Sequence, residues 1–259
     1  MSGGLEIVGL TVSYGSRRRA ATVVDDVTLR VPTGETLGLV GESGSGKSTI
    51  AKAVVGLLAP SAGHITLDGQ SLTGQPSRQL RRRVQLVSQD PYASLNPRMT
   101  IGAAIAEAID PARANPRRHT EAIGRWLETV SLDPAVAQRY PHEFSGGQRQ
   151  RIAVARALAV EPEVIIADEI TSALDCSVQA EVLNLLLDLR ERLGLTMLFI
   201  SHDLAVVRHI SDAVAVLRHG ELVESGSCAQ IYENPTHAYT QKLLASVPTF
   251  TTTRPPGPR

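Results

Sequence analysis

The sequence has no surplus of either charge and very little cysteine. Its 259 residues include 26 Lys and Arg against 26 Asp and Glu, so the formal net charge is zero. Without a basic surplus no overall field attracts nucleic acid or an anionic membrane surface, and we expect no nucleic-acid partner. The two cysteines, Cys176 and Cys228, are far apart and match no metal or redox spacing. We expect both to be small buried residues of a protein in a reducing compartment.

A long apolar run is also absent from the sequence. No stretch of eighteen or more apolar residues occurs, and even the segment 183–189 is interrupted by Asn184 and Asp188. The N-terminus, 1–6, lacks a charged region followed by an apolar one, so we expect no secretory signal. If the protein works at a membrane, a partner must supply the membrane-spanning part.

Strand-like and helix-like segments alternate along most of the chain. Apolar periodicity and turn residues predict strands at 5–14, 22–31, 37–40, 64–67, 84–87, 164–167, 197–201, 213–218 and 222–224. They predict helices at 47–58, 147–159 and 178–192, with two short helices near the end. Strands that alternate with helices are typical of an α/β fold with a parallel sheet.

One region breaks this alternation. After residue 91 the strand patterns vanish, and Ile101, Ile105 and Ile109 recur at helical spacing. The length of the chain is at the upper end for one α/β domain. We therefore expect one domain over 1–248 with a helical insert at about 91–150, and a disordered Thr/Pro-rich tail at 249–259.

A glycine-rich loop joins the strand 37–40 to the helix that begins at Lys47, and it fits the phosphate-loop pattern Gly-x-x-x-x-Gly-Lys-Ser. Backbone N–H groups of such a loop and the dipole of the following helix converge on a phosphate. Lys47 reaches the β- and γ-oxygens, and Ser48 offers a hydroxyl to Mg²⁺. The sequence therefore predicts a site for ATP and Mg²⁺. The predicted ATP-binding residues are Gly41, Glu42, Ser43, Gly44, Ser45, Gly46, Lys47, Ser48 and Thr49.

Two carboxylates, Asp168 and Glu169, follow the apolar strand 164–167. In open parallel sheets, ligands bind at the carboxyl ends of the strands, which is where this pair lies. Asp168 suits Mg²⁺, directly or through water, and Glu169 would polarise the attacking water. By itself an Asp-Glu pair after a strand is more often a solvated loop. The phosphate loop upstream favours the catalytic interpretation.

A second candidate anion site precedes the predicted helix 147–159. It consists of Ser145, Gly146, Gly147 and Gln148. Alone, this group could be an N-cap and nothing more. The longer segment 144–151, Phe-Ser-Gly-Gly-Gln-Arg-Gln-Arg, resembles the signature motif of ABC-transporter nucleotide-binding domains. The resemblance extends over residues 5–247, with the other motifs of that family in order around this one.

By resemblance, Tyr14 takes the place of the aromatic that stacks on adenine, Gln89 that of the Q-loop glutamine, and 172–175 that of the D-loop. His202 matches the switch histidine that contacts the γ-phosphate. Taken alone, Tyr14 could equally be a core residue and His202 a structural one. The catalytic residues implied by the resemblance are Lys47, Gln89, Glu169 and His202. The implied Mg²⁺ ligands are Ser48, Gln89 and Asp168.

The resemblance also implies a fold and an assembly. The fold would be an α/β P-loop NTPase of the ABC type, with an N-terminal antiparallel β subdomain and an inserted α-helical subdomain. Two such domains pack head to tail in this family. Each ATP then lies between the phosphate loop of one domain and the signature residues of the other. We therefore expect a second ABC ATPase subunit as partner, either a copy of this chain or a paralogue.

Further segments narrow the resemblance. The segments 88–98, 140–144 and 234–240 resemble the ATPase subunits of oligopeptide, dipeptide and nickel importers. They imply an ATP hydrolase at the cytoplasmic face of the membrane, with two membrane permeases and an extracytoplasmic substrate-binding protein as partners. Peptide is our first choice of cargo, and nickel or a metal chelate is the second. A third possibility is that the chain is an ATPase of a soluble complex for phosphonate breakdown, whose ATPases look similar. The alternative from another class is a non-transport ATPase that acts as a nucleotide-driven switch in a soluble complex.

The sequence departs from the family pattern at a few positions. Ile170 and Cys176 stand where the family commonly has Pro and Val, and Ala238 replaces a usual Pro. Because proline fixes φ and isoleucine does not, we expect Ile170 to alter the loop that carries Glu169 and to change the hydrolysis rate modestly. The chain ends soon after Val247 without the cysteine-bearing tail of some relatives, so we expect no iron-sulfur cluster.

Overall fold

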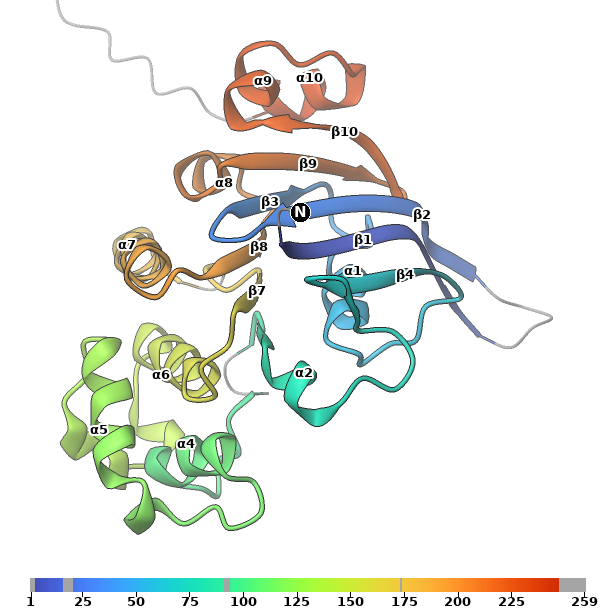
Figure 1. The fold of residues 1–259 in the computed structure, drawn as a ribbon. Coiled ribbons are helices and arrows are strands. Elements are labelled where there is room, and N and C mark those ends of the chain that lie inside the picture. Colours follow the sequence, from blue (N-terminus) through green and yellow to red (C-terminus); the bar gives the residue numbers. More distant parts are fainter. Residues whose placement is uncertain (1–2, 16–20, 91–93, 173, 247–259) are drawn as a thin grey trace, which may run out of the picture.

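The protein is built from two β-sheets with helices between and around them (Figure 1). The computed structural model describes residues 3–15, 21–90, 94–172 and 174–246. The predicted disordered tail, 249–259, lies outside the described residues. The same holds for the start of the predicted helical insert, 91–93, and for Ala173 of the D-loop segment.

The N-terminal sheet has four strands in the order β2-β1-β4-β5. They are β1 (Gly4–Tyr14), β2 (Ala21–Pro32), β4 (Ala62–Leu67) and β5 (Gln70–Ser71). All neighbours in this sheet are antiparallel. Leu5 of β1 pairs with Val31 of β2 on one side and with Leu67 of β4 on the other, and all three side chains are buried. This apolar face is the one that packs against the rest of the protein.

The main sheet has six strands in the order β10-β9-β3-β8-β7-β6. They are β3 (Thr36–Val40), β6 (Val84–Val87), β7 (Val164–Asp168), β8 (Thr196–Ile200), β9 (Ala213–Arg218) and β10 (Glu221–Ser227). The strands β9, β3, β8, β7 and β6 run parallel, and β10 is antiparallel to β9. Every residue of β3, β7 and β8 is buried, as expected for parallel strands covered on both faces. The predicted α/β class with a parallel core is confirmed.

Helices cover both faces of the main sheet. They are α1 (Lys47–Val54), α2 (Arg78–Arg82), α4 (Ile101–Ile109), α5 (Thr120–Thr129), α6 (Gly146–Leu158), α7 (Cys176–Leu193), α8 (Leu204–Ile210), α9 (Cys228–Glu233) and α10 (Ala238–Ala245). Side chains of α1 share one hydrophobic cluster with the N-terminal sheet and one face of the main sheet. Side chains of α4 to α8 form a second cluster against the opposite face. Helix α1 is therefore enclosed between the two sheets (Figure 1).

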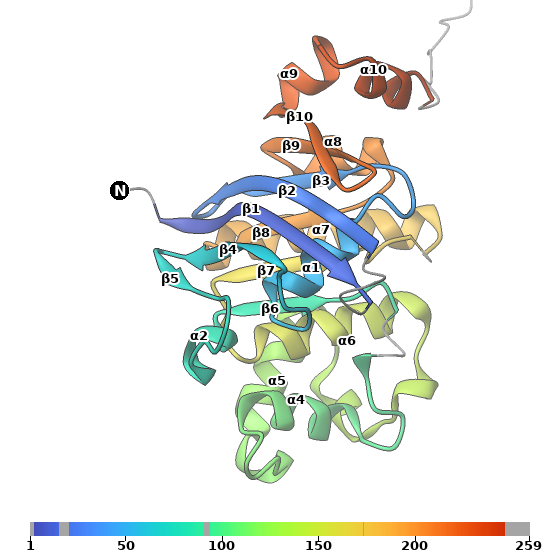
Figure 2. The ribbon, with the colours of Figure 1, turned by 90° about the vertical axis from the view of Figure 1, so that its right-hand side faces the viewer.

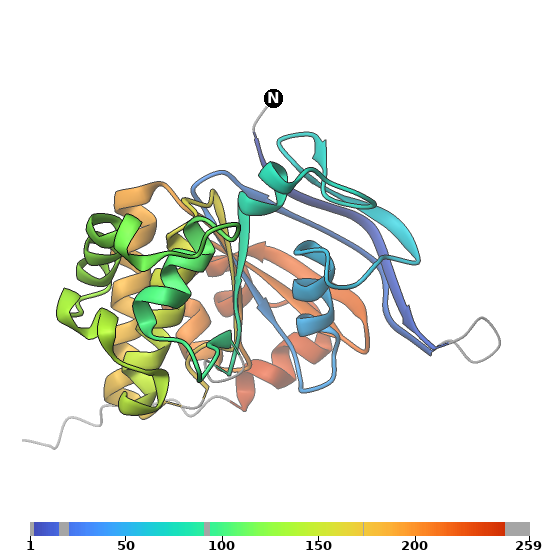
Figure 3. The same cartoon turned by 90° about the horizontal axis from the view of Figure 1, so that it is seen from below.

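The segment between β6 and β7 lies on the far side of the main sheet from the N-terminal sheet, as Figure 3 shows by the green helices and the blue strands. Its described residues form helices and turns and no strand. Helices α9 and α10 lie at the other end of the molecule from α4 and α5 (Figure 2). Within the described ranges, no helix is both long and apolar enough to cross a membrane.

Two expectations from the sequence are wrong. The first helix ends at Val54 and not at residue 58, because Gly56 takes a φ of 74° that breaks the helix. The cysteines are not both buried: Cys176 is exposed and Cys228 is partly exposed. Cys176 is the first residue of α7, directly after the N-cap Asp175, at a helix start that faces solvent.

Candidate functional site

The loops that carry the predicted site residues meet at the carboxyl edge of the main sheet. The phosphate loop, residues 41–49, follows β3, and Asp168 ends β7. His202 follows β8, and Gln89 follows β6. Because these strands are parallel neighbours, their carboxyl ends lie on one edge of the sheet. Topology alone therefore gathers segments that are more than a hundred residues apart in the sequence.

Two glycines of the phosphate loop have backbone conformations that a side chain would disturb. Gly41 has a φ of 156°, and a Cβ there would lie 2.1 Å from the carbonyl oxygen of Leu217 in β9. Gly44 has a φ of 80°, and a Cβ there would point into open space. The loop thus lies close against β9 at one end, and the space beside Gly44 is open. An accessible glycine-rich backbone at a helix start fits a phosphate group.

Lys47 is the first residue of α1, and its side chain turns back into the loop. Its Nζ donates to the carbonyl oxygens of Gly41 at 2.8 Å and Glu42 at 2.9 Å. Only 4% of Lys47 is exposed. Burial lowers the pKa of this ammonium group, although the nearby carboxylates of Glu169 and Asp168 act in the opposite direction. The loop therefore holds a partly desolvated positive charge at its centre.

Ser48 and Asp168 form a pair of oxygen ligands beside this lysine. The Ser48 hydroxyl donates to Asp168 Oδ1 at 3.0 Å, and only 7% of Asp168 is exposed. Burial raises the pKa of Asp168, and the hydrogen bond from Ser48 partly offsets this effect. A hydroxyl oxygen next to a carboxylate, at the mouth of a phosphate loop, fits the hard-oxygen preference of Mg²⁺.

Glu169 and His202 face each other across the ends of β7 and β8. The distance from His202 Nδ1 to Glu169 Oε2 is 3.5 Å. The Glu169 backbone has a φ of 50°, and its N–H donates to the carbonyl of Ile200 at 2.9 Å. Ile170, which follows, is 2% exposed and lies in the core. The Glu169 backbone is therefore held in a left-handed conformation by its hydrogen bond to Ile200 in β8 and by the burial of the next residue, Ile170. This conformation sets the direction of the glutamate side chain.

Gln89 and Tyr14 lie at the border of this group. The Gln89 amide donates to the Ser172 hydroxyl at 3.2 Å, and that hydroxyl donates to the carbonyl of Glu169 at 2.9 Å. Gln89 is thus linked to the loop after β7 through the Ser172 hydroxyl. Tyr14 is 42% exposed, and its hydroxyl lies 3.5 Å from the hydroxyl of Thr49. Its ring is available at the surface next to the phosphate loop.

Comparison with known proteins agrees with this geometry. Residues 24–172 match the family described as ABC transporter, which is more than half of the chain. The chain belongs to the ABC transporter family. Residues 223–257 match a second description, the C-terminal region of oligopeptide/dipeptide transporters. The protein is therefore an ABC transporter ATPase, with the α/β P-loop fold and the antiparallel N-terminal sheet expected from the sequence. Its core sheet is mixed, because the edge strand β10 runs antiparallel to β9.

Relatives of this ABC transporter subunit cover most of its length. A protein of Brucella ovis named as a peptide import ATP-binding protein is 49% identical over 248 residues, which are 94% of this chain and 78% of the relative. A protein of Brucella abortus with the same description is 52% identical over 236 residues, 89% of this chain and 71% of the relative. The solved structure of CbiO1 from Clostridium perfringens, part of the ABC transporter complex CbiONQ, superposes with a TM-score of 0.78 at 25% identity. That match covers 90% of this chain and 92% of the other.

The segment 145–148, which resembles the ABC signature motif, begins α6, and its first residue is exposed. Ser145 is the N-cap: its hydroxyl accepts from the Gln148 N–H, and the Gln148 side chain accepts from the Ser145 N–H. Gly147 is buried, and a Cβ there would lie 2.2 Å from Val178 in α7. The described contacts of Ser145 are therefore with its own helix, and none of them is with the phosphate loop.

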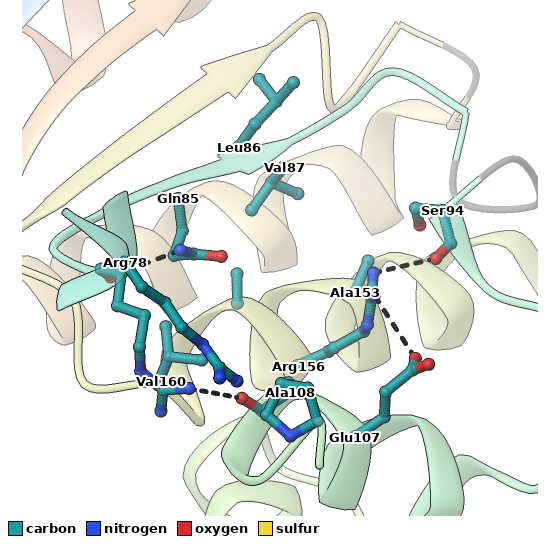
Figure 4. A pocket seen from close by; sticks show the side chains of 13 residues that line it. Arg78, Gln85, Leu86, Val87, Ser94, Glu107, Ala108, Ala153, Arg156 and Val160 are labelled. Carbon is teal, nitrogen blue, oxygen red and sulfur yellow. Dashed lines mark hydrogen bonds and ion pairs between the residues drawn. The ribbon is translucent and has the colours of Figure 1, made fainter. Parts of the chain in front are cut away.

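A cavity of about 260 Å³ lies apart from the phosphate loop, between β6 and the helices α4 and α6 (Figure 4). Arg78, Arg82 and Arg156 line it together with Glu107. The Arg82 guanidinium donates to the carbonyls of the last turn of α4, and Arg156 donates to the Ser94 carbonyl. The lining therefore carries more positive than negative charge, and none of its residues belongs to the phosphate loop.

One contact of the phosphate loop has no counterpart among the site residues expected from the sequence. The N–H of Glu42 donates to the hydroxyl of Tyr239 at 3.2 Å, so α10 reaches the phosphate loop. Tyr239 lies within the segment 234–240, which resembles the peptide and nickel importers. Its place in the matched C-terminal region 223–257 is the signal in the sequence that marks Tyr239. The contact itself joins residues 197 positions apart, and no local sequence pattern predicts such a contact.

Proposed function

We propose that this ABC transporter ATPase energises the uptake of oligopeptides or dipeptides across the cytoplasmic membrane. One observation carries the peptide assignment: a single chain joins the ATPase region to the C-terminal region described for oligopeptide/dipeptide transporters. The names of the Brucella relatives support the same cargo. We place the protein at the cytoplasmic face of the membrane as a peripheral subunit.

In this proposal the phosphate loop binds the phosphates of ATP. The N–H groups that surround Gly44 and Gly46 donate to phosphate oxygens at the start of α1. Lys47 exchanges its contacts with the carbonyls of Gly41 and Glu42 for an anionic oxygen, which relieves the cost of its burial. Tyr14, exposed beside Thr49, offers its ring to the adenine base.

Ser48 and Asp168 would hold Mg²⁺, with Gln89 as a third oxygen ligand. When bound, this ion would neutralise charge that develops on the transferred phosphoryl group. The Gln89 amide nitrogen donates to Ser172, so the amide oxygen Oε1 is the atom that would ligate Mg²⁺. A pair of protein oxygens that is completed by substrate oxygens and water is the usual form of a nucleotide-linked Mg²⁺ site.

Glu169 and His202 would act on the hydrolytic step. The Glu169 carboxylate accepts a hydrogen bond from the attacking water and orients it in line with the γ-phosphorus. His202, 3.5 Å from Glu169, is placed to donate a hydrogen bond to the γ-phosphate region.

A second ABC ATPase subunit would complete each site. The segment 145–148 is the start of a 13-residue helix, and the hydroxyl of its exposed Ser145 accepts a hydrogen bond from the Gln148 N–H. Such a helix start carries partial positive charge and free N–H groups that favour an anion. In the assembled pair, Ser145, Gly146, Gly147 and Gln148 of one subunit would contact the γ-phosphate held by the other.

Two membrane permeases and an extracytoplasmic substrate-binding protein complete the proposed importer. We assign the arginine-lined cavity beside β6 to a cytoplasmic segment of a permease that carries an acidic side chain, because its net charge is positive. The cavity borders the strand that leads to Gln89, so a segment seated there would act on the Q-loop. Co-purification of this chain with two permeases, and its loss after the Arg78→Glu change, tests this assignment.

The assignment of Glu169 is tested with a Glu169→Gln change in the assembled complex. The neutral amide lacks the negative charge with which the carboxylate polarises the attacking water, so we expect ATP hydrolysis to fall by about 100-fold or more. ATP binding should remain, and the nucleotide-bound dimer should accumulate because its closing ligand is no longer removed. Hydrolysis is measured by phosphate release and dimerisation by size-exclusion chromatography with light scattering.

Glu163→Gln is the matched control. Glu163 precedes the same strand, β7, at its opposite end, and it pairs with Arg83. The control should hydrolyse ATP at the normal rate. If Glu169→Gln left the activity of the complex intact, Glu169 would not be the catalytic carboxylate.

The cargo is identified by a ligand screen on the binding protein of the same system. Binding of oligopeptides or dipeptides supports the proposal, whereas binding of nickel or a metal chelate replaces peptide as cargo. A complex that contains no permease would favour the alternative, an ABC ATPase that acts as a nucleotide-driven switch in a soluble assembly.

A further inference from the structure

The peptide group between Gly41 and Glu42 is held from both sides. Its carbonyl oxygen, on Gly41, accepts a hydrogen bond from Lys47 Nζ at 2.8 Å. Its N–H, on Glu42, donates to the Tyr239 hydroxyl at 3.2 Å. A peptide group is planar, so a rotation that moves the N–H moves the carbonyl with it. The Tyr239 hydroxyl therefore restrains the carbonyl oxygen that holds Lys47.

Tyr239 is itself held firmly in place. It is the second residue of α10 and is 7% exposed. The guanidinium of Arg218, at the end of β9, lies over its ring, 5.0 Å from the centroid. Its backbone N–H donates to His237 Nδ1 at 3.1 Å, which caps the start of α10. A hydroxyl on a packed ring is a more rigid acceptor than a water molecule would be.

The turn before α10 is anchored to β10 by Glu224. This carboxylate accepts from the N–H and the hydroxyl of Thr236 and from the N–H of His237, at 2.7, 2.8 and 3.2 Å. Partial burial raises the pKa of Glu224, but the hydroxyls of Thr240 and Thr236 and the two N–H groups outweigh it and lower the pKa to about 2. Glu224 is thus ionised at neutral pH and fixes the position from which Tyr239 reaches the loop.

The loop is also bounded by the turn between β9 and β10. The N–H of Gly220 donates to the carbonyl of Ser45 at 3.0 Å. This contact holds a different peptide group of the loop, that between Ser45 and Gly46. The C-terminal part of the chain therefore touches the phosphate loop at Ser45 and at Glu42, and the Tyr239 hydroxyl is the contact on the peptide group whose carbonyl holds Lys47.

We propose that Tyr239 is a positioning residue for ATP binding: its hydroxyl fixes the Gly41–Glu42 peptide group and thereby the resting position of Lys47. The proposal rests on the phosphate-binding role given to Lys47 above. It assigns a purpose to the docking of the C-terminal region on the ATPase core. Packing of the ring alone would need no hydroxyl, so the hydroxyl is the group to remove.

The first test is hydrogen exchange in the nucleotide-free chain. Tyr239→Phe keeps the ring beneath Arg218 and removes only the acceptor of the Glu42 N–H. Loss of one neutral hydrogen bond, about 0.5–1.5 kcal/mol, corresponds to a faster exchange of the Glu42 amide by about threefold to tenfold. Exchange is followed by NMR at Glu42, with the Ile50 amide, which donates to Gly46 within the start of α1, as the internal reference.

The second test is the affinity for ATP, measured by titration calorimetry on the full chain. We expect Tyr239→Phe to raise the Kd by about threefold to tenfold, because the loop must then order itself on binding. The assembled complex should show the same rise in KM with little change in kcat. Tyr232→Phe is the matched control: it removes a hydroxyl in α9 that donates to the Leu204 carbonyl, away from the loop. It should leave both the Glu42 exchange and the ATP affinity unchanged.

Several outcomes would overturn the positioning role. These are an unchanged Glu42 exchange in Tyr239→Phe, a faster exchange without a change in Kd, or an equal rise in Kd in Tyr232→Phe. Failure of the underlying assignment looks different: a Lys47→Ala chain that bound ATP normally would remove the phosphate-binding role of Lys47. Even if Lys47 did not bind phosphate, the rate of hydrogen exchange at the Glu42 amide would still report directly on whether Tyr239 holds the loop.

Discussion

The phosphate loop and the segment 145–148 are both helix starts for which we propose phosphate contacts, but their surroundings differ. The loop is enclosed by its own chain: β9 presses on Gly41, Gly220 contacts Ser45, and Tyr239 holds Glu42. The signature segment has an exposed Ser145 whose hydroxyl caps its own helix. The comparison agrees with our proposal that one half of the nucleotide site is formed by a single chain and that the other half comes from a partner subunit.

This difference separates two kinds of variant. A change in the loop should reduce ATP binding by the isolated chain. A change in the signature segment should leave that binding intact and reduce only the hydrolysis that needs two subunits. The first two predictions therefore compare binding by one chain with turnover by the assembly, and the third concerns the stability of the single chain.

Lys47→Ala should have the largest effect. Removal of the ammonium group takes away a charge directed at the β- and γ-phosphates, so hydrolysis should fall by about 1,000-fold and ATP affinity by about tenfold or more. Because Lys47 is desolvated in the fold, its loss should cost little stability, and the melting temperature should stay within a few degrees. Lys242→Ala, an exposed lysine of α10, serves as control. Normal hydrolysis in Lys47→Ala would contradict the central position given to the phosphate loop.

Ser145→Ala should have an intermediate effect, confined to the assembly. It removes both the proposed γ-phosphate contact and an N-cap, so a cap control is needed. Ser227→Ala provides it, because Ser227 forms the same kind of capping box with Gln230 at the start of α9. Each change should cost about 1 kcal/mol of stability. Only Ser145→Ala should lower the hydrolysis rate of the complex, by about tenfold or more, with ATP affinity of the single chain unchanged. Equal activities in the two variants would indicate that the signature serine is only a cap.

The smallest expected effect is on folding stability, through the pH dependence that Asp168 contributes. Burial raises the pKa of Asp168 in the fold, so the folded state holds its proton more tightly than the unfolded chain does. Stability from this residue is then highest at low pH and falls as pH rises from the unfolded value, near 3.8, through the raised folded value. Asp168→Asn should therefore be more stable than the unmodified chain at pH 7 without nucleotide or metal. The two should converge below the unfolded pKa.

Urea unfolding at neutral and acidic pH measures this difference, with Asp188→Asn in the exposed part of α7 as control. Asp168→Asn should at the same time lose Mg²⁺-dependent hydrolysis. A loss of stability in Asp168→Asn at pH 7 would mean that the carboxylate is favourable in the fold, contrary to the effect of its burial.

Much of the fold could be predicted from the sequence because its signals are local. The apolar strands 164–168 and 196–200 lie within one residue of their predicted positions at either end. Glycines and a lysine at fixed spacing after a strand specify the phosphate loop without reference to the rest of the chain. Helix ends were less accurate, as in α1, because Gly56 stops a helix that the apolar pattern alone would continue.

Other features depend on residues that are distant in the sequence. The exposure of Cys176 follows from the direction in which α7 leaves the loop after β7. The link from Gln89 to Ser172 joins two loops that meet only because β6 and β7 are neighbours in the sheet. Residue type and spacing do not encode such contacts.

The sequence by itself determined that the chain is an ABC ATPase, and the order of Lys47, Asp168, Glu169 and His202 after buried strands predicts the reacting groups and their edge of the sheet. Only the tertiary structure decided how these groups are held. The burial that shifts the pKa values of Lys47 and Asp168, and the Tyr239 hydroxyl on the Glu42 amide, arise when two sheets and the C-terminal helix pack around one loop. The physical reason is that burial and long-range hydrogen bonds are properties of the packed chain and not of any segment within it.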